Sequence, residues 1–262
     1  AVYAVGMLKG RRDRYHRLGF LIAFTVAAVV MPFQIFVGDV VARHAYHAEP
    51  AKFAAIEILS HTATHVPETL GGILVNGKVR FGIRIPSGAS LLAGFRTDTQ
   101  IRGTDAIPVD VRPDAHLVNI VHLSFDTMVA SAFALLGVAV WFGAVWARRR
   151  DLPRSRLFLW CAAAAGLLSV VCLETGWVVT EVGRQPWTVN GLLLTRDAGA
   201  TSGNLWLFFA VTFVIYAAVG TATVLVLRSM QRRWRAGADL DLYVPYGPDQ
   251  PVDHDVAEVA ST

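Results

Sequence analysis

The sequence is poor in charge and nearly free of cysteine. Only 17% of its 262 residues are charged and 54% are hydrophobic, whereas about 25% are charged in an average soluble domain. The two cysteines, Cys161 and Cys172, lie in one apolar stretch. They would be about 16 Å apart on a helix, too far to form a disulfide. No Cys-x-x-Cys-His motif occurs, which excludes covalent attachment of a haem through that motif.

Long apolar runs are what the sequence has instead. Three stretches hold almost no charge, and a fourth is interrupted only by Glu174; each can cross about 30 Å of hydrocarbon at about 1.5 Å per residue. Polar faces with the 3.6-residue period of a soluble amphipathic helix are missing. The stretches are 18–37, 117–147, 157–180 and 205–227. The sequence therefore predicts an all-α fold, a polytopic transmembrane helix bundle with four complete spans.

The basic residues are gathered in three clusters between or beside these spans. If the spans alternate in direction, all three clusters fall on one side of the membrane, as the positive-inside rule requires. Cytoplasmic topology therefore explains the net charge of +4 better than a nucleic-acid site does. The clusters are Lys9, Arg11, Arg12, Arg14 and Arg17; Arg148, Arg149, Arg150, Arg154 and Arg156; and Arg228, Arg232, Arg233 and Arg235.

The order of these segments predicts four regions. The apolar opening 1–8 runs into a basic loop, as the last turns of a membrane helix do, so we expect earlier helical turns upstream. Residues 1–37 then comprise this helix stub, an inside loop and the first span. Residues 38–115 form a long outer segment that folds against the membrane surface, 116–235 hold three spans, and 236–262 form a polar, disordered cytoplasmic tail.

Two residues inside the predicted spans are candidates for chemistry. Glu174 is a carboxylate near the outer end of a span, where a charge needs a partner or a cavity. It could pair with an arginine, be a protonated structural acid, relay protons, or ligate a metal or haem. Met128 offers a thioether, a soft axial ligand for haem iron, although most methionines in membrane helices are packing residues.

Two further motifs lie outside the spans. The pentapeptide 183–187, Gly-Arg-Gln-Pro-Trp, ends the Glu174 span and places the cation of Arg184 near the interface; it could also be only a helix stop with an aromatic anchor. The segment 49–57 predicts a short helix after its proline. On it, Lys52 could donate to a quinone oxygen and Glu57 could accept a quinol proton. Its alternative interpretation is a helix that simply lies on the bilayer.

Taken together, these stretches resemble subunit I of the cytochrome bd quinol oxidases. The resemblance rests on Gly-Arg-Gln-Pro-Trp at 183–187, Glu-Thr-Gly-Trp at 174–177, Phe-Asp-Thr-Met at 125–128, Gly-Asp at 38–39 and the 50–57 helix, which occur in the family's order. It covers residues 1 to about 235. The outer segment is short, so it is similar to the family's short Q-loop class.

The resemblance implies roles for five residues. Met128 would be an axial ligand of the low-spin haem b, and Glu174 the ligand of the high-spin haem b beside haem d. Lys52 and Glu57 would belong to the quinol site. Arg184 would be structural or would neutralise a haem propionate. Some members carry arginine two residues before the methionine ligand, where this chain has aspartate.

At the level of the whole protein, the resemblance implies a terminal oxidase of the bacterial inner membrane with two haems b and one haem d. It would oxidise ubiquinol or menaquinol at the outer face, reduce O₂ to water, generate a proton motive force and pair with a subunit II. The family's histidine ligands would lie upstream of Ala1, so we expect this chain alone to be inactive. The alternatives are a haem-containing electron-transfer anchor without oxidase activity and a proton-coupled transporter.

Overall fold

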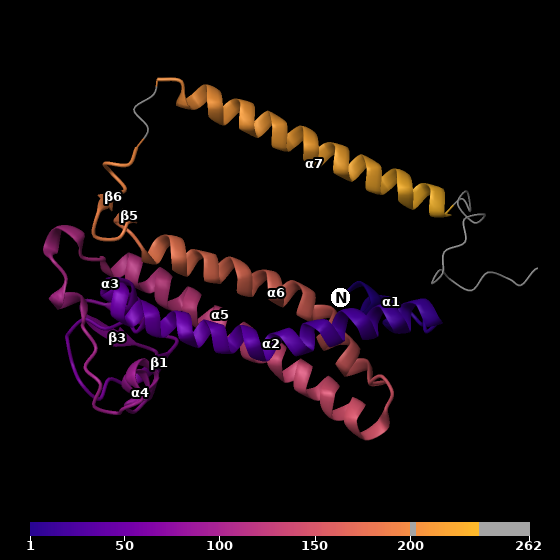
Figure 1. Ribbon diagram of the computed structural model, residues 1–262, viewed down its shortest axis with the longest axis horizontal. Coiled ribbons are helices and arrows are strands. Elements are labelled where there is room, and N and C mark those ends of the chain that lie inside the picture. The colour runs from indigo at the N-terminus through magenta and orange to yellow at the C-terminus, as the bar shows by residue number, and fades with distance from the viewer. Residues whose placement is uncertain (200–202, 236–262) are drawn as a thin grey trace, which may run out of the picture. The chain divides into compact units, whose positions relative to one another are not determined.

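The computed structural model describes residues 1–199 and 203–235, which fall into two units that are described separately. Residues 1–12 and 16–198 form the first unit; residues 13–15 and the chain from Gly199 onward form the second. The predicted tail 236–262 lies outside the described residues. The α-helices are α1 (Val2–Leu8), α2 (Arg14–Ala48), α3 (Pro50–Ile56), α4 (Gly88–Gly94), α5 (Ala115–Arg149), α6 (Arg156–Gly183) and α7 (Leu205–Arg235) (Figure 1).

Four of these helices, α2, α5, α6 and α7, are long and apolar enough to cross a membrane. The predicted polytopic helical bundle is therefore confirmed, and the four predicted spans lie inside these helices. Helix α2 continues through Gly38 and Asp39 to Ala48, so the first residues of the predicted outer segment are helical. In the second unit, the side chains of α7 are exposed over residues 205–233.

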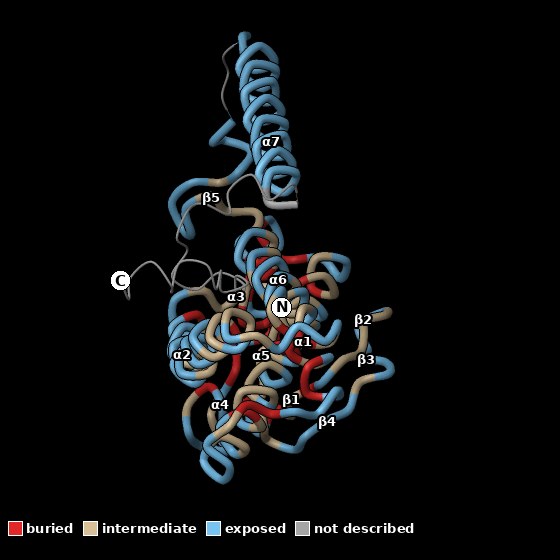
Figure 2. The backbone as a smooth tube through the Cα atoms, turned by 90° about the vertical axis from the view of Figure 1, so that its right-hand side faces the viewer, coloured by how far each residue is buried: buried red, intermediate tan, exposed pale blue. Residues whose placement is uncertain are grey.

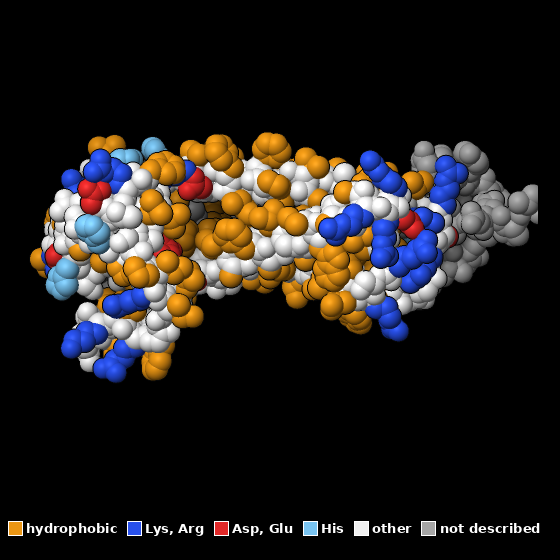
Figure 3. All heavy atoms as spheres, turned by 90° about the horizontal axis from the view of Figure 1, so that it is seen from below, with side chains coloured by type: hydrophobic (Ala, Val, Ile, Leu, Met, Phe, Trp, Pro, Cys, Tyr) orange, Lys and Arg blue, Asp and Glu red, His pale blue; other side chains and the backbone are white. Residues whose placement is uncertain are grey.

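One end of the first unit brings two of the basic loops together. The guanidinium of Arg17, before the first span, donates to Asp151 at 3.0 Å, between the second and third spans. An apolar cluster from α1, α2, α5 and α6 packs beside this contact, with Phe158 fully buried against Phe20 and Phe142. Figure 3 shows hydrophobic side chains along the middle of the face that it draws, with Lys and Arg side chains toward both ends. This contact supports the predicted common side for these two loops.

The opposite end of the first unit carries the outer segment, which contains two antiparallel strand pairs. Strand β1 (Glu68–Leu70) pairs with β4 (Ile83–Ile85), and β2 (Ile73–Val75) pairs with β3 (Lys78–Arg80). The β2–β3 turn is Asn76-Gly77, both with positive φ, as a tight two-residue hairpin requires. In Figure 2 the buried residues include stretches around α3, α4 and β1. The outer segment is therefore a folded layer with its own small core.

Helix α3 joins this layer to the membrane helices. Proline at position 50 opens the helix, as predicted, because its missing N–H needs no partner in the first turn. Ala55 and Ile56 pack with Val118 and Val121 of α5 and Val179 of α6 in one buried apolar cluster. This packing holds the face of α3 that carries Ala55 and Ile56 against the ends of α5 and α6.

Candidate functional site

Lys52 lies at the junction of α3 with the end of α6. Its ammonium group pairs with the carboxylate of Glu49, and its side chain is 13% exposed. A Cβ added at Gly183 would lie 3.0 Å from Cγ of Lys52, so glycine there makes room for the lysine methylenes. The predicted quinone-binding lysine is therefore held in place by an acid on its own segment.

Glu57 ends α3 and is buried, with 7% of its surface exposed. Burial, followed by the negative charge of Glu68 and a hydrogen bond with it, raises the pKa of Glu57 well above its usual range. Burial also raises the pKa of Glu68, whereas the hydrogen bond from Glu57 lowers it. Glu57 is thus the protonated partner, and the two acids share one proton.

A ladder of polar side chains on α5 holds the outer segment above this pair. Asn119, His122 and Asp126 lie at i, i+3 and i+7 and so share one helix face. The Asn119 amide oxygen accepts from Leu74 N at 2.6 Å, and its nitrogen donates to Leu74 O at 3.1 Å. Asp126 accepts the backbone N–H of Gly71.

His122 is the centre of the ladder and is 1% exposed. Its Nδ1 lies 2.6 Å from the carbonyl oxygen of Ile56, and its Nε2 lies 2.9 Å from that of Gly71. Carbonyl oxygens only accept hydrogen bonds, so the ring is the donor in these contacts. The carboxylate of Asp126 lies 3.5 Å from Nε2. His122 is a functional candidate that the sequence analysis missed, because its partners are backbone atoms that no motif marks.

Met128 lies in the seam between α5 and α6. A Cβ added at Gly176 would lie 3.0 Å from the Met128 sulfur, and Cys172 Sγ lies 3.5 Å from the Met128 carbonyl oxygen. Glu174 lies two residues from both Gly176 and Cys172, about 200° around the helix, and it is exposed. The structure therefore places Met128 of α5 against the Gly176 face of α6, whereas Glu174 lies on another face of α6, and it does not bring the two together.

The donor chemistry of these two residues fits haem iron. Among the side chains described, residues 1–199 and 203–233, the Glu174 carboxylate has no ion pair or hydrogen bond, so the alternative of a paired structural charge finds no arginine there. A carboxylate on a membrane-spanning helix needs a compensating positive centre. The same residues hold no group of three or more His, Cys, Asp and Glu side chains for a metal ion, but haem iron needs only one or two protein ligands.

Arg184 caps the end of α6 and pairs with Glu181 at 2.6 Å. The chain then turns through Gln185 and Pro186 into β5 (Trp187–Val189), which pairs with β6 (Leu193–Leu194). In the same hairpin, Asn190 donates to the carbonyl oxygen of Ala48 at 3.0 Å. The predicted helix stop is therefore confirmed, and it lies at the same end of the unit as the outer segment.

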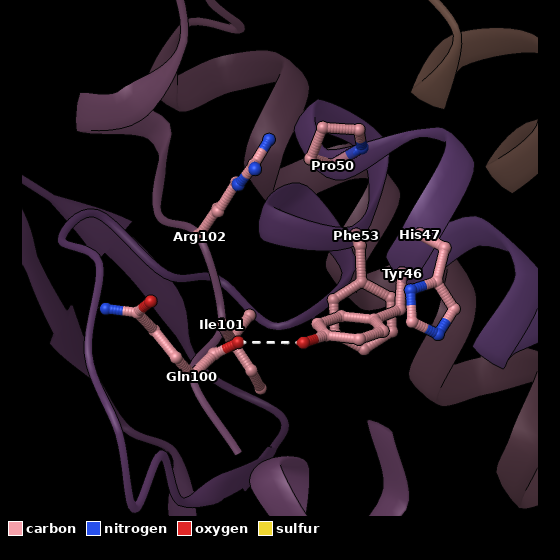
Figure 4. Close-up of a pocket in the computed structure, with 7 residues that line it drawn as sticks. All are labelled: Tyr46, His47, Pro50, Phe53, Gln100, Ile101 and Arg102. Atoms are coloured by element: carbon pink, nitrogen blue, oxygen red, sulfur yellow. Dashed lines mark hydrogen bonds between the residues drawn. The ribbon is translucent and has the colours of Figure 1, made fainter. Parts of the chain in front are cut away.

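A cavity of about 250 Å³ lies on another side of α3. Figure 4 shows the rings of Tyr46 and Phe53 between His47 on one side and Ile101 and Gln100 on the other. The Tyr46 hydroxyl donates to the Gln100 carbonyl at 2.9 Å. The full lining is Tyr46, His47, Pro50, Phe53, Gln100, Ile101 and Arg102. Lys52 and Glu57 are not among these residues, so α3 separates the cavity from the predicted quinol-site pair.

Four helices of membrane length define a multi-pass membrane protein. In the first unit, the folded layer at one end holds the buried acid Glu57. The chain belongs to the cytochrome bd terminal oxidase subunit I family, whose model matches residues 1–234. The predicted family resemblance is therefore confirmed.

Named relatives agree with this assignment. The chain is 32% identical over 250 residues to a Bacillus subtilis (strain 168) protein provisionally named cytochrome bd menaquinol oxidase subunit I, covering 92% of this chain and 55% of that protein. It is 28% identical over 284 residues to cytochrome bd ubiquinol oxidase subunit 1 of the same organism, covering 98% and 58%. The bd oxidase structure from Geobacillus thermodenitrificans aligns with a TM-score of 0.71 at 29% identity, covering 88% and 53%. The chain spans about half the length of the curated relatives it matches.

Proposed function

We propose that this chain is part of a membrane terminal oxidase that oxidises quinol at the outer face and reduces O₂ to water. Membership of the subunit I family supports this reaction class. The observation that carries it is the buried polar site at the outer end, where α3 presents both Lys52 and the proton-holding Glu57. The same proposal places the protein in the bacterial inner membrane with a subunit II, where its turnover generates a proton motive force.

Lys52 and Glu57 have complementary roles in this proposal. The Lys52 ammonium donates a hydrogen bond to a quinone oxygen, and Glu57 receives a proton from the quinol hydroxyl. Lys52 must turn from Glu49 toward the substrate to do so, a movement that a flexible four-carbon side chain permits. Quinol is ubiquinol or menaquinol, the two substrates that the names of the relatives carry.

Met128 and Glu174 would hold haem iron in the low-spin and high-spin haems b, and haem d would complete the set. When bound, these groups supply the electron carriers between quinol and O₂. This chain's own contribution is to hold the donors, the thioether in the α5–α6 seam and the carboxylate on an exposed face of α6. Arg184, ion-paired to Glu181 at the outer end, is then a structural residue or a partner of a haem propionate.

Substitution of Lys52 in the full-length subunit of the intact complex tests the quinol site. Removing a charged hydrogen-bond donor costs about 1.5–3 kcal/mol, so Lys52→Ala should lower kcat/KM for quinol roughly 10-fold or more while the haem spectra stay unchanged. Lys78→Ala, an exposed lysine of the same outer segment, is the matched control and should keep the wild-type rate.

A substitution in the cavity beside α3 tests the alternative binding site. If Arg102→Ala lowers kcat/KM for quinol and Lys52→Ala does not, quinol binds in the cavity and the Lys52 assignment is wrong. Reduced-minus-oxidised spectra of the complex separate the rival functions, because a transporter has no haem bands and an electron-transfer anchor lacks the haem d band. Absence of quinol-dependent O₂ uptake in a haem-replete wild-type complex would overturn the oxidase proposal.

A further inference from the structure

Glu68 is the second acid of the outer site, and nothing in the sequence patterns marked it. It opens β1, where it pairs in register with Ile85 of β4. Its Oε2 atom is buried and has no hydrogen-bond partner among the described residues, although the residue as a whole is only half-buried. A buried acceptor without a partner destabilises a fold, so its presence in this folded layer calls for an explanation.

The fold builds this position from several elements. A Cβ added at Gly88 would lie 2.6 Å from Cβ of Glu68, so only glycine at the start of α4 leaves room for this side chain. His122 donates to the carbonyl of Ile56, the residue before Glu57, and to that of Gly71, three residues after Glu68. The His122 ring thus joins the two segments that carry the acids.

Burial of Glu57 and its contact with Glu68 raise the pKa of Glu57, which favours the form that already holds a proton. A proton from quinol can enter only when the Glu57 proton moves on, and Glu68 is its hydrogen-bonded acceptor. We propose that Glu68 is the second proton acceptor of the quinol site, receiving the Glu57 proton and passing it to the outer aqueous phase. This inference rests on the proposed quinol oxidation.

The relay moves one proton at a time from quinol to Glu68. A quinol O–H bond breaks and its proton binds the Glu57 carboxyl, while the Glu57 proton transfers to Glu68. Glu68 then releases its proton to water and is ionised again. Two such cycles remove the two protons of one quinol. Its two electrons would leave one at a time to ferric haem of the oxidase, each reducing one Fe(III) to Fe(II), as quinol becomes quinone.

The charges around the pair favour this relay. The positive charge of His122 on α5 favours the ionised form of Glu68, and the negative charge of Asp126 on the same helix opposes it. Glu57 is faced by Glu68 and by Asp126, and both disfavour a second negative charge there. The pair therefore holds one proton at rest, and its apparent titration belongs to both acids together.

Glu68→Gln in the full-length subunit of the intact complex tests the relay. Glutamine keeps the shape and can hydrogen-bond to Glu57 but cannot accept a proton, so kcat for quinol oxidation should fall roughly 100-fold, the scale of one lost acid–base group. The rise of kcat with pH that accompanies Glu68 ionisation should disappear. Quinol-induced infrared difference spectra should lose one protonated-carboxyl band, a readout that does not depend on turnover.

Two further variants complete the experiment. Asp98→Asn, an exposed acid paired with Arg96 in the same outer segment, should leave rate, pH profile and spectra as in the wild type. Glu68→Asp keeps a carboxylate and should retain a pH-dependent rise, shifted from that of the wild type. If Glu68→Gln fails to assemble, the Glu68→Asp profile decides, and an unshifted profile overturns the relay.

The failures of the two proposals are distinguishable. A Glu68→Gln complex with the wild-type rate, pH profile and infrared bands overturns the role of Glu68 while quinol oxidation stands. A haem-replete wild-type complex without quinol-dependent O₂ uptake at any pH overturns the proposed function itself.

Discussion

Replacing His122 with alanine removes the donor of two buried hydrogen bonds. The carbonyl oxygens of Ile56 and Gly71, 2.6 and 2.9 Å from the ring nitrogens, would lose their partner, and Asp126 would lose the ring beside it. Each buried acceptor left without a donor costs about 1–3 kcal/mol. With the lower end of this range for each of the two carbonyl oxygens, the free energy of docking the outer segment onto α5 should weaken by about 2 kcal/mol.

Hydrogen exchange of the intact complex measures this docking directly. Amides that exchange through local opening should do so roughly 30-fold faster for a loss of about 2 kcal/mol. The effect should be confined to residues 57–79, which the α5 ladder contacts, and should spare amides in the middle of α5 and α6. Gly71 N–H, which donates to Asp126, should be among the amides most affected.

His116→Ala is the matched control, because His116 lies on the same helix and is exposed. It should leave exchange in residues 57–79 within about twofold of the wild type, since surface changes of this kind alter stability by no more than about 0.5 kcal/mol. A His122→Ala complex that exchanges like the His116→Ala complex would refute the assignment of His122 as the residue that docks the outer segment.

Three further predictions concern the haem ligands and the pH dependence. Met128→Leu should abolish or convert the low-spin haem spectrum, although the substitution keeps the side-chain volume and should lower stability by less than about 1.5 kcal/mol. An unchanged spectrum would exclude Met128 as a ligand. Glu174→Gln should deplete the high-spin haem b signal and stop O₂ reduction while the low-spin haem stays reducible by quinol; normal haem content with normal turnover would return Glu174 to a structural acid. Because burial raises the pKa of Glu57, the docked state keeps a proton that the open state loses, so docking should weaken as pH rises from the ordinary glutamate pKa through the raised one. Hydrogen exchange corrected for intrinsic rates should show this slope, and a slope equal in Glu57→Gln would contradict it.

The membrane architecture could be predicted because it follows from local composition. Apolar runs long enough to span a bilayer form helices wherever they occur, since their backbone groups must bond within the segment. The short helix after Pro50 and the helix stop after Gly183 follow from the missing N–H of proline and the freedom of glycine. The C-terminal end of α2 was harder to predict from the sequence. Residues 38–48 contain charges, which end a predicted transmembrane span, but a helix that extends beyond the membrane tolerates them.

Only part of the candidate site could be predicted from the sequence, for a different reason. Lys52 and Glu57 could be singled out because a basic and an acidic residue stand close together on a short helix. Their partners could not: Glu49 holds Lys52, and Glu68 reaches Glu57 only because β1 and α4 fold beside α3.

By itself, the sequence determined which segments are helical, which can enter a membrane and which side chains are available for chemistry. The tertiary structure alone decided what those side chains contact. His122 bonds to carbonyl oxygens 66 and 51 residues away in the chain, and every residue has such a carbonyl, so no residue pattern identifies the two that are used. Burial of Glu57 likewise depends on packing between α3 and α5, and it is this burial that makes an ordinary glutamate hold its proton.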